Sequence, residues 1–171
     1  MAPDEEKLRE TLEGIASLYT RDLDRHGISP KSVGWKDKAS QRLRFENLSQ
    51  VIDWSTAHEG ISINDLGCGY GAMFRYLDEM PSVRLTNYYG YEISEEMLAA
   101  AEKFVADTSA KFIQSPRVTK KTDYSFVSGT FNAKLGASDK IWTEYFREML
   151  MDLATKSTSG FAFNALTTYV D

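Results

Sequence analysis

The chain has 171 residues, a length that suits one domain with a full hydrophobic core. Hydrophobic residues make up 42% of it and charged residues 26%, as in ordinary globular proteins. Its formal net charge of −5 argues against a protein that binds nucleic acids or acidic membranes non-specifically, because such binding needs a basic surface. A short basic run, "RVTKK" at 117–121, is interpreted as an exposed loop.

The sequence carries no targeting signal and no metal-binding pattern. No apolar run reaches the roughly 18 residues of a membrane span, and the acidic N-terminus lacks the basic-then-apolar order of a signal peptide. We therefore expect a cytoplasmic protein without membrane contact. Cys68 is the single cysteine, which excludes an internal disulfide, and the two histidines, His26 and His58, lie far apart. No metal site is expected.

Two helices are expected before the first strand. Pro3 followed by three acidic residues is typical of a helix start, and apolar residues then recur at helical spacing until Gly27 supplies an end. A second amphipathic helix is predicted over about Lys38 to Trp54. Its inward-facing residues are predicted to be Leu43, Leu48, Val51 and Ile52. We expect residues 1–58 to form an N-terminal helical cap.

Strands and helices alternate through the rest of the chain. Strands are predicted over 61–66, 85–92, 110–114, 123–129 and 160–170, and helices over 72–80, 94–107 and 139–155. Such alternation predicts an α/β fold with a parallel sheet covered by helices on both faces. Tyr88, Tyr89 and Tyr91 of the second strand are predicted to pack in the sheet. Residues 59–171 would form the core, in one structural domain with the cap.

A glycine-rich turn follows the first predicted strand, in the stretch "INDLGCGYGAMF" at 63–74. Gly67, Gly69 and Gly71 occupy alternate positions, where they allow a tight turn and let a ligand lie directly on the backbone. In an open parallel sheet, ligands bind at the carboxyl ends of the strands. Glu92 ends the second strand about twenty residues later, where a carboxylate can accept both hydroxyls of a ribose. The pattern predicts a ligand that contains a nucleoside.

The glycines alone do not decide which nucleoside is bound. The stretch "GCGYGA" also fits the dinucleotide fingerprint G-x-G-x-x-G/A, so a nicotinamide-dependent enzyme stays open as an alternative. Asp65 stands two residues before the first glycine, where a carboxylate would repel a pyrophosphate but could hold an ammonium group. The two helices ahead of the first strand also favour another ligand, because dinucleotide-binding domains commonly begin near that strand.

The stretch "DLGCGYG" at 65–71, together with "GYEIS" at 90–94, resembles the cofactor site of class I S-adenosylmethionine-dependent methyltransferases. The resemblance extends from about residue 61 to 166. It implies a doubly wound, mostly parallel, Rossmann-like sheet with S-adenosylmethionine bound at the glycine turn. The N-terminal helices resemble the caps that close such sites in this family.

The resemblance also assigns the parts of the cofactor to residues of this chain. The methionine moiety would lie against Gly67 to Gly71 near Asp65, and Glu92 would take the ribose hydroxyls. Adenine would lie between Ile93 and Met97, near Ser115, where the family often has an aspartate. The cofactor-binding residues implied are Asp65, Gly67, Cys68, Gly69, Tyr70, Gly71, Glu92, Ile93, Met97, Ser115 and Ser128. The Asn- or Asp-Pro-Pro-aromatic motif of amino-directed methylases is absent from "SGTFN" at 128–132, which counts against methylation of that kind.

Several side chains outside this set have two interpretations. Tyr19 and His26, late in the first helix, face either a ligand or the solvent. Arg42 and Arg44 either reach the cofactor carboxylate or lie on a solvated helix face. Trp35 is either a substrate wall or an anchor of the loop between the cap helices. No catalytic residue is predicted, because the sulfonium already activates the methyl group and the protein mainly aligns the reactants.

These features predict an S-adenosylmethionine-dependent methyltransferase that acts on a small-molecule acceptor. The alternative is a non-catalytic module of the same fold that holds the cofactor or a partner. A nicotinamide-dependent oxidoreductase is the less favoured third interpretation.

The position of the last predicted strand raises one further expectation. The family usually has seven strands in the order 3-2-1-4-5-7-6, whereas this sequence stops after the fifth, so strands 6 and 7 are expected to be absent. The fifth strand would then be an apolar sheet edge without protecting lysines or prolines. Two explanations are open: a fragment of a longer enzyme, or a homo-oligomer that pairs through residues 160–170.

Overall fold

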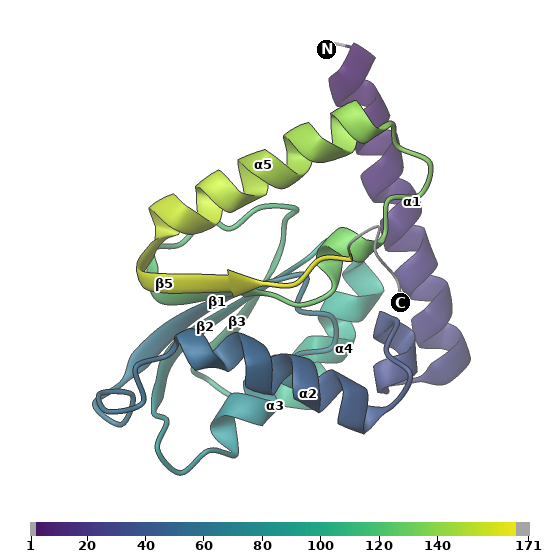
Figure 1. Ribbon diagram of the computed structural model, residues 1–171. Coiled ribbons are helices and arrows are strands. Elements are labelled where there is room, and N and C mark those ends of the chain that lie inside the picture. Colours follow the sequence, from purple (N-terminus) through teal and green to yellow (C-terminus); the bar gives the residue numbers. More distant parts are fainter. Residues whose placement is uncertain (1–2, 167–171) are drawn as a thin grey trace.

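The computed structural model describes residues 3–166, which form a single sheet with helices on both faces (Figure 1). The helices are α1 (Pro3–His26), α2 (Lys38–Leu48), α3 (Ala72–Asp78), α4 (Glu95–Val105) and α5 (Asp139–Lys156), with short 3-10 turns η1 (Pro30–Val33), η2 (Ser49–Val51) and η3 (Thr130–Asn132). The strands are β1 (Ile61–Leu66), β2 (Leu85–Glu92), β3 (Ala110–Gln114), β4 (Thr122–Val127) and β5 (Ser157–Phe163).

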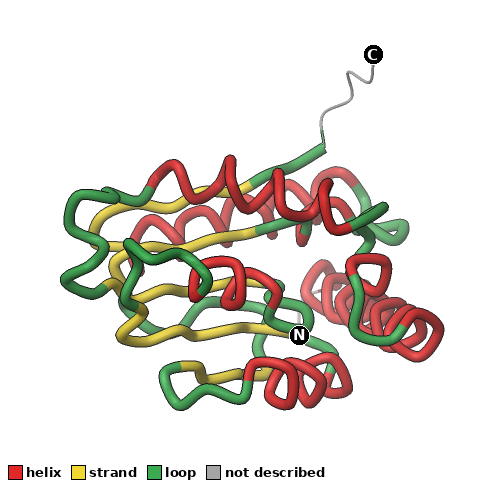
Figure 2. Tube along the Cα trace, turned by 90° about the horizontal axis from the view of Figure 1, so that it is seen from below, coloured by secondary structure: helices red, strands yellow, loops and turns green. Residues whose placement is uncertain are grey.

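The sheet confirms the predicted fold class. Its strand order is β3-β2-β1-β4-β5, and every pair of neighbouring strands is parallel. The five strands run side by side when the molecule is seen from below (Figure 2). Within residues 3–166 there is no sixth or seventh strand, so β3 and β5 are the two edges.

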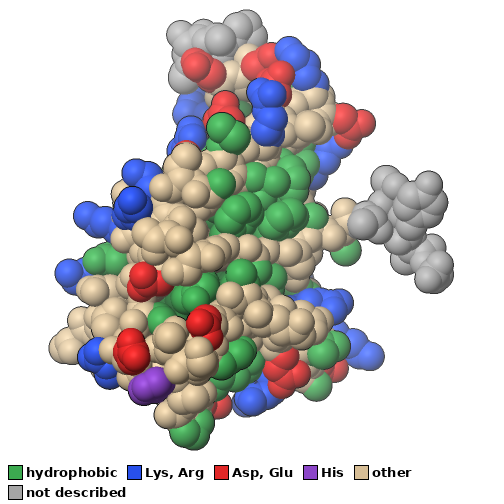
Figure 3. Space-filling model, turned by 60° about the vertical axis from the view of Figure 1, so that its left-hand side comes forward, with side chains coloured by type: hydrophobic (Ala, Val, Ile, Leu, Met, Phe, Trp, Pro, Cys, Tyr) green, Lys and Arg blue, Asp and Glu red, His purple; other side chains and the backbone are tan. Residues whose placement is uncertain are grey.

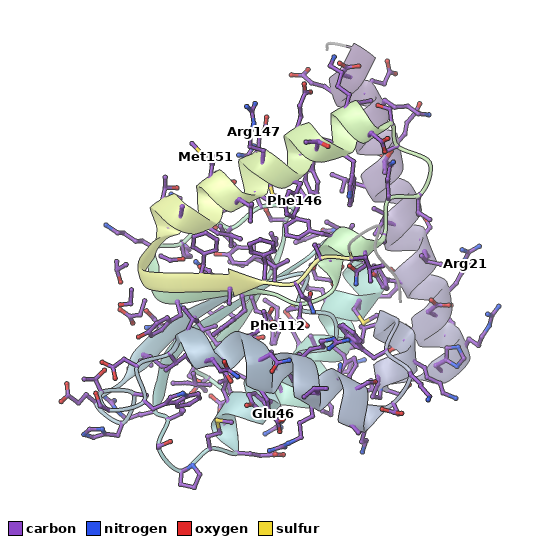
Figure 4. The ribbon with its side chains drawn as sticks, viewed as in Figure 1. Arg21, Glu46, Phe112, Phe146, Arg147 and Met151 are labelled. Atoms are coloured by element: carbon purple, nitrogen blue, oxygen red, sulfur yellow. The ribbon has the colours of Figure 1, made fainter. Side chains whose placement is uncertain are left out.

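Each face of the sheet has its own hydrophobic core. On one face, α2, α3 and α4 enclose Phe74 and Tyr88, whose rings meet edge to face with centroids 5.2 Å apart. On the other face, α5 covers Leu66, Val127 and Phe131. Figure 4 shows Phe146 pointing from α5 toward the sheet, whereas Arg147 and Met151 point away from it. The helix predicted over 139–155 is therefore present, and it turns an apolar face toward the sheet.

Helix α1 lies across the carboxyl ends of the strands (Figures 1 and 2). The hydroxyl of Thr20 bonds to the Ser94 hydroxyl at 2.9 Å and donates to the Glu96 carboxylate at 2.9 Å, both at the start of α4. Lys140 of α5 forms an exposed ion pair with Asp4 at 2.9 Å. Contacts with α4 and α5 thus hold α1 over the edge of the sheet where the glycine turn lies.

The prediction for the second helix is wrong in the residue at which the helix ends and in one residue that was expected to face inward. Helix α2 begins with a capping box, in which Asp37 accepts a hydrogen bond from the Ser40 N–H at 2.8 Å, and ends at Leu48 rather than Trp54. Leu43 is 50% exposed. The buried stripe is Gln41, Phe45 and Leu48, spaced four and three residues apart, and Leu43 lies off that stripe.

The last predicted strand is shifted. Strand β5 begins at Ser157, directly after α5 and without a loop, and ends at Phe163 rather than continuing to 170. Residues 167–170 of that prediction lie outside the described residues. The predicted strand over 61–66 and those over 85–92 and 110–114 match β1, β2 and β3 residue for residue.

The connection from β3 to β4 crosses the sheet without a helix and contains the basic run at 117–121. Its residues are exposed as predicted, except for Val118, which is buried under α5. Arg117 forms ion pairs with two acids of α5, Asp152 at 2.6 Å and Glu148 at 3.3 Å. The run is therefore partly neutralised. Among residues 3–166, no helix is both long and apolar enough to cross a membrane.

Candidate functional site

The glycine turn joins β1 to α3 at the carboxyl end of β1. The N–H groups of Gly67 and Cys68 both donate to the Tyr91 carbonyl, at 2.8 and 3.0 Å, which ties the turn to the neighbouring strand β2. Gly67, Gly69 and Gly71 all have positive φ angles, of 72°, 53° and 83°. Side chains rarely adopt that backbone conformation, so glycine is required here by the turn itself.

Parts of the protein lie close against each of these glycines. A β-carbon on Gly67 would lie 2.0 Å from the Thr130 hydroxyl oxygen, and one on Gly69 would lie 2.6 Å from Cγ1 of Val33. A β-carbon on Gly71 would meet Val105 of α4 at 2.6 Å, so this third glycine serves the packing of α3 against α4. The first two glycines instead lie against side chains of η3 and η1, Thr130 and Val33, near the strand ends.

Glu92 ends β2 beside this turn and holds it through backbone hydrogen bonds. Its Oε1 accepts from the N–H groups of Ile93 at 2.7 Å and Ser94 at 3.1 Å, and its Oε2 accepts from the Gly69 N–H at 3.1 Å. Burial raises the pKa of the Glu92 carboxyl, and the three N–H donors oppose that rise. A carboxylate can accept about four hydrogen bonds, so about one position remains for a ligand hydroxyl.

Asp65 is buried two residues before the first glycine and accepts a hydrogen bond from the Tyr88 hydroxyl. Burial raises the pKa of Asp65 to about 7, although the bond from Tyr88 lowers it. No basic side chain of the described residues forms an ion pair with this carboxyl. A positively charged ligand group placed beside it would therefore be stabilised.

A cleft opens between the strand ends and the helices α1 and α5, with about 590 Å³ of space that is partly open to solvent. The strand ends contribute Leu66, Gly67, Gly69, Tyr91, Glu92, Ile93, Ser115, Pro116, Ser128 and Thr130. The helices and η1 contribute Leu12, Ile15, Tyr19, Val33, Trp142 and Tyr145.

A smaller cavity continues from the cleft on the far side of the glycine turn. The cleft and the smaller cavity share four lining residues: Val33, Gly67, Gly69 and Ser128. Asp65 lines the smaller cavity but not the cleft. The hydroxyl oxygen of Ser128 is buried and has no hydrogen-bond partner, the single such side-chain atom among residues 3–166. Buried polar atoms are normally satisfied, so this oxygen is placed to meet a polar group of a ligand.

Known proteins that resemble this chain identify its family. Residues 64–133 match the family model described as "Methyltransferase domain". The chain is 43% identical over 116 residues to "Putative methyltransferase Rv1506c" of Mycobacterium tuberculosis, an alignment that covers 67% of this chain and 69% of that protein. The chain belongs to the class I S-adenosylmethionine-dependent methyltransferases.

One solved structure agrees with this fold, and a second is similar in sequence. The DhpI–SAH complex superposes on 90% of this methyltransferase and 67% of its own chain, with a TM-score of 0.52 and 14% identity. An S-adenosylmethionine-dependent methyltransferase from Mesorhizobium loti has 24% identity and a TM-score of 0.48, over 69% of this chain and 51% of that one. The methyltransferase thus spans about half the length of the Mesorhizobium loti protein.

The fold brings most of the predicted cofactor residues of the methyltransferase to one place. Gly67, Gly69, Glu92, Ile93, Ser115 and Ser128 line the cleft, and Asp65, Cys68 and Tyr70 line the smaller cavity. Gly71 and Met97 line neither, and Met97 is fully buried on the inner face of α4. Burial raises the pKa of the Cys68 thiol well above its ordinary value, which agrees with a wall residue rather than a nucleophile.

The side chains for which the sequence left two interpretations differ in position: some line a cavity and others are exposed. Tyr19 lines the cleft, where burial raises its pKa to about 12, and Trp35 lines the smaller cavity. His26 is exposed at the end of α1. Arg42 bonds to Glu46 at 3.1 Å, and the exposed Arg44 stacks 5.8 Å from the Trp35 ring centre. Neither arginine lines the cleft or the smaller cavity.

Sequence reasoning missed several residues of the site, among them Val33, Thr130, Trp142 and Tyr145. Val33 and Thr130 lie in segments without periodicity, where no pattern shows which side chain turns inward. Trp142 and Tyr145 lie on the apolar face of α5. Their place at the N-terminal end of that face carries them past the strand ends and into the cleft. The spacing of apolar residues predicts which face of a helix is buried, but it does not predict which end of that face reaches a site.

Proposed function

We propose that this methyltransferase binds S-adenosylmethionine in the cleft at the carboxyl ends of β1 and β2 and transfers its methyl group to a small-molecule acceptor. The observation that carries the proposal is the meeting of Gly67, Gly69 and Glu92 on one wall of a single cleft. The cleft is recessed between the strand ends and the helices α1 and α5, which favours a small molecule over a macromolecular acceptor.

The residues present fit the cofactor. Glu92 retains about one acceptor position for a ribose hydroxyl, and Asp65 is a buried carboxyl without a basic partner among the described residues, suited to an ammonium group. Ser128 offers an unpaired buried hydroxyl between the two cavities. When bound, the cofactor supplies a methyl group that its own sulfonium activates. The protein's part is then to align the acceptor and exclude water.

The helical cap completes the proposed site. Leu12, Ile15 and Tyr19 of α1 face the strand ends across the cleft, and Val33 of η1 lies over Gly69. We assign residues 1–58 to the cap and residues 59–171 to cofactor binding, as two parts of one structural domain. The cap supplies the walls that would keep water from the reacting atoms.

A non-catalytic module that holds the cofactor is the second candidate. It is favoured by one observation, that Thr130 and Val33 lie in the space next to Gly67 and Gly69. The resemblance puts the methionine moiety in that space, so either these side chains move on binding or the cofactor sits differently from the family pattern.

Binding and turnover separate these candidates. Calorimetry should show binding of S-adenosylmethionine and S-adenosylhomocysteine and none of NAD. Formation of S-adenosylhomocysteine in the presence of a panel of small-molecule acceptors would then establish an enzyme. Cofactor binding without turnover on any acceptor would favour the module, and binding of NAD in place of both cofactors would contradict the proposal.

A further inference from the structure

The cleft has two chemically different walls. The strand-end wall carries the polar groups, namely the backbone at Gly67 and Gly69, the Glu92 carboxyl and the hydroxyls of Ser115, Ser128 and Thr130, beside the apolar Leu66, Ile93 and Pro116 and the ring of Tyr91. The opposite wall, from α1 and α5, is apolar and aromatic: Leu12, Ile15, Tyr19, Trp142 and Tyr145. Trp142 and Tyr145 contact each other, with ring centres 5.3 Å apart and planes tilted by 38°. If the cofactor lies on the strand-end wall as proposed, this aromatic wall faces the acceptor.

Charge on the cleft is of one sign. Among the described residues that line it, Glu92 is the single one that carries a formal charge, and no lysine, arginine or histidine is present. Arg117, which contacts α5, does not line the cleft and is paired with Asp152 of that helix at 2.6 Å. A carboxylate or phosphate on the acceptor would enter a buried, apolar space with an acid and no base. Burying an unpaired charge is strongly unfavourable.

No group that lines the cleft is free to take a proton from a weakly acidic acceptor, and Asp65 lines only the smaller cavity, where the proposed function assigns it to the cofactor's ammonium group. Burial raises the pKa of both Tyr19 and Tyr145 to about 12, so neither phenol ionises near neutral pH. The Glu92 carboxylate already accepts three backbone hydrogen bonds. Hydroxyl acceptors need such a base, whereas a nitrogen or sulfur atom with a free lone pair does not.

Resting on the proposed function, we infer that the acceptor is an uncharged, largely apolar, flat molecule whose nucleophile is a neutral nitrogen or sulfur atom. The lone pair of that atom forms the new bond to the methyl carbon as the sulfonium's sulfur–carbon bond breaks, and the bond electrons return to sulfur. The positive charge passes from sulfur to the acceptor atom beside Glu92 and the aromatic rings, which favour a cation. An amine product then releases its extra proton to water.

The test uses three probes that share one flat bicyclic frame without a ring nitrogen: 2-aminonaphthalene, 2-hydroxynaphthalene and naphthalene-2-carboxylate. Each is titrated by calorimetry into protein saturated with S-adenosylhomocysteine at a pH of about 8. The amine should bind at least about 10-fold more tightly than the carboxylate, because a tenfold difference needs only about 1.4 kcal/mol. With S-adenosylmethionine in place of the product, the amine alone should yield S-adenosylhomocysteine.

Two variants tie these results to the aromatic wall. Trp142→Ala should weaken binding of the amine about 10-fold and leave S-adenosylhomocysteine affinity within about twofold. Leu12→Arg supplies the missing cation and should reverse the preference in favour of the carboxylate. Ser17→Arg places the same charge on an exposed position of α1 outside the cleft and should leave the preference unchanged.

The outcomes separate the two proposals. Equal or tighter binding of the carboxylate by the unchanged protein, or no binding of any probe to the saturated protein, would overturn the acceptor proposal alone. Failure of S-adenosylhomocysteine itself to bind would overturn the proposed function and the acceptor proposal together. Turnover of the hydroxyl probe in preference to the amine would show that a base is present and would also overturn the inference.

Discussion

Asp65 is the buried carboxyl of the site whose protonation should respond to pH near neutrality. Its pKa in the folded protein is about 7, raised by burial from an ordinary value near 3.8. Between these two values the folded state keeps a proton that the unfolded state has lost. The free energy of unfolding should therefore fall as the pH rises through this window, and level off above it. Three pKa units correspond to a loss on the order of 4 kcal/mol.

Asp65→Asn should remove this part of the pH dependence. The amide has the same shape and can still accept the hydrogen bond from Tyr88 but does not ionise. Urea unfolding at pH about 4.5 and about 8 measures the difference. We expect the unchanged protein to lose several kcal/mol relative to the variant between these pH values. Burial also raises the pKa of Glu92. Because Glu92 is present in both proteins, its contribution to the pH dependence cancels in the comparison. Parallel pH profiles would show that Asp65 is ionised throughout.

The sequence indicated both acids of the site but not how the protein holds them. Strand ends and glycine spacing placed Asp65 and Glu92 correctly, because both depend on local pattern. Tyr88 was predicted to pack in the sheet, but the prediction did not include the hydrogen bond that its hydroxyl donates from β2 to Asp65 on the neighbouring strand β1. The three N–H donors to Glu92 belong to the backbone, which a sequence pattern does not distinguish. Long-range polar partners are thus the part that the sequence leaves out.

At the scale of elements, the contact between η1 and the glycine turn is the one that most constrains the site. A β-carbon on Gly69 would lie 2.6 Å from Val33, and the glycine has a φ of 53°. Gly69→Ala therefore combines two costs, backbone strain of about 1–2 kcal/mol and overpacking of about 1–3 kcal/mol. The double variant Gly69→Ala with Val33→Ala should recover the overpacking part. Urea unfolding of the four proteins in this cycle measures the recovery.

Gly27→Ala is the matched control for backbone strain. Gly27 also has a positive φ, of 62°, but a β-carbon there would meet no atom within 4 Å. Its substitution should cost only the strain, and Val33→Ala should not change that cost. If the losses in the free energy of unfolding caused by Gly69→Ala and Val33→Ala simply add in the double variant, then Val33 is not in close contact with the glycine turn. That result would contradict the packing of η1 described here.

Elements with a strong local pattern were predicted well, and those shaped by tertiary contacts were not. The boundaries of β1, β2 and β3 follow from runs of alternating or apolar residues between turn signals. Helix α2 was predicted too long because Val51 and Ile52 continue its apolar pattern, although η2 and the following turn bend the chain away after Leu48. Strand β5 starts earlier than predicted because α5 passes into it without any turn residue.

At the scale of the whole molecule, the free edge of β5 stands out within residues 3–166. The strand pairs with β4 on one side only, and its residues carry neither charge nor proline. Phe163 and Leu166 are exposed nearby, as is Met151 on α5. Figure 3 shows apolar side chains gathered on this side of the molecule. Uncharged edges tend to pair with another strand, which supports the predicted association through this strand.

Sedimentation tests that association. The protein should form concentration-dependent oligomers, and Ser159→Lys should make it monomeric because a lysine on an exposed edge position blocks pairing. Ala154→Lys adds the same charge to an exposed position of α5, away from the strand, and should not change the association. A monomer at all concentrations would contradict the prediction and show that the β5 edge tolerates solvent.

Calorimetric titration of S-adenosylhomocysteine into Glu92→Gln and Glu95→Gln tests the central claim, that the cofactor binds in the cleft against Glu92. The glutamine removes charge-assisted hydrogen bonds worth about 1.5–3 kcal/mol, so affinity should fall roughly 10- to 100-fold. Glu95 is an exposed acid on the following helix, and its substitution should leave affinity unchanged. Circular dichroism would confirm that both variants fold. A folded Glu92→Gln protein that binds as tightly as Glu95→Gln would contradict the account.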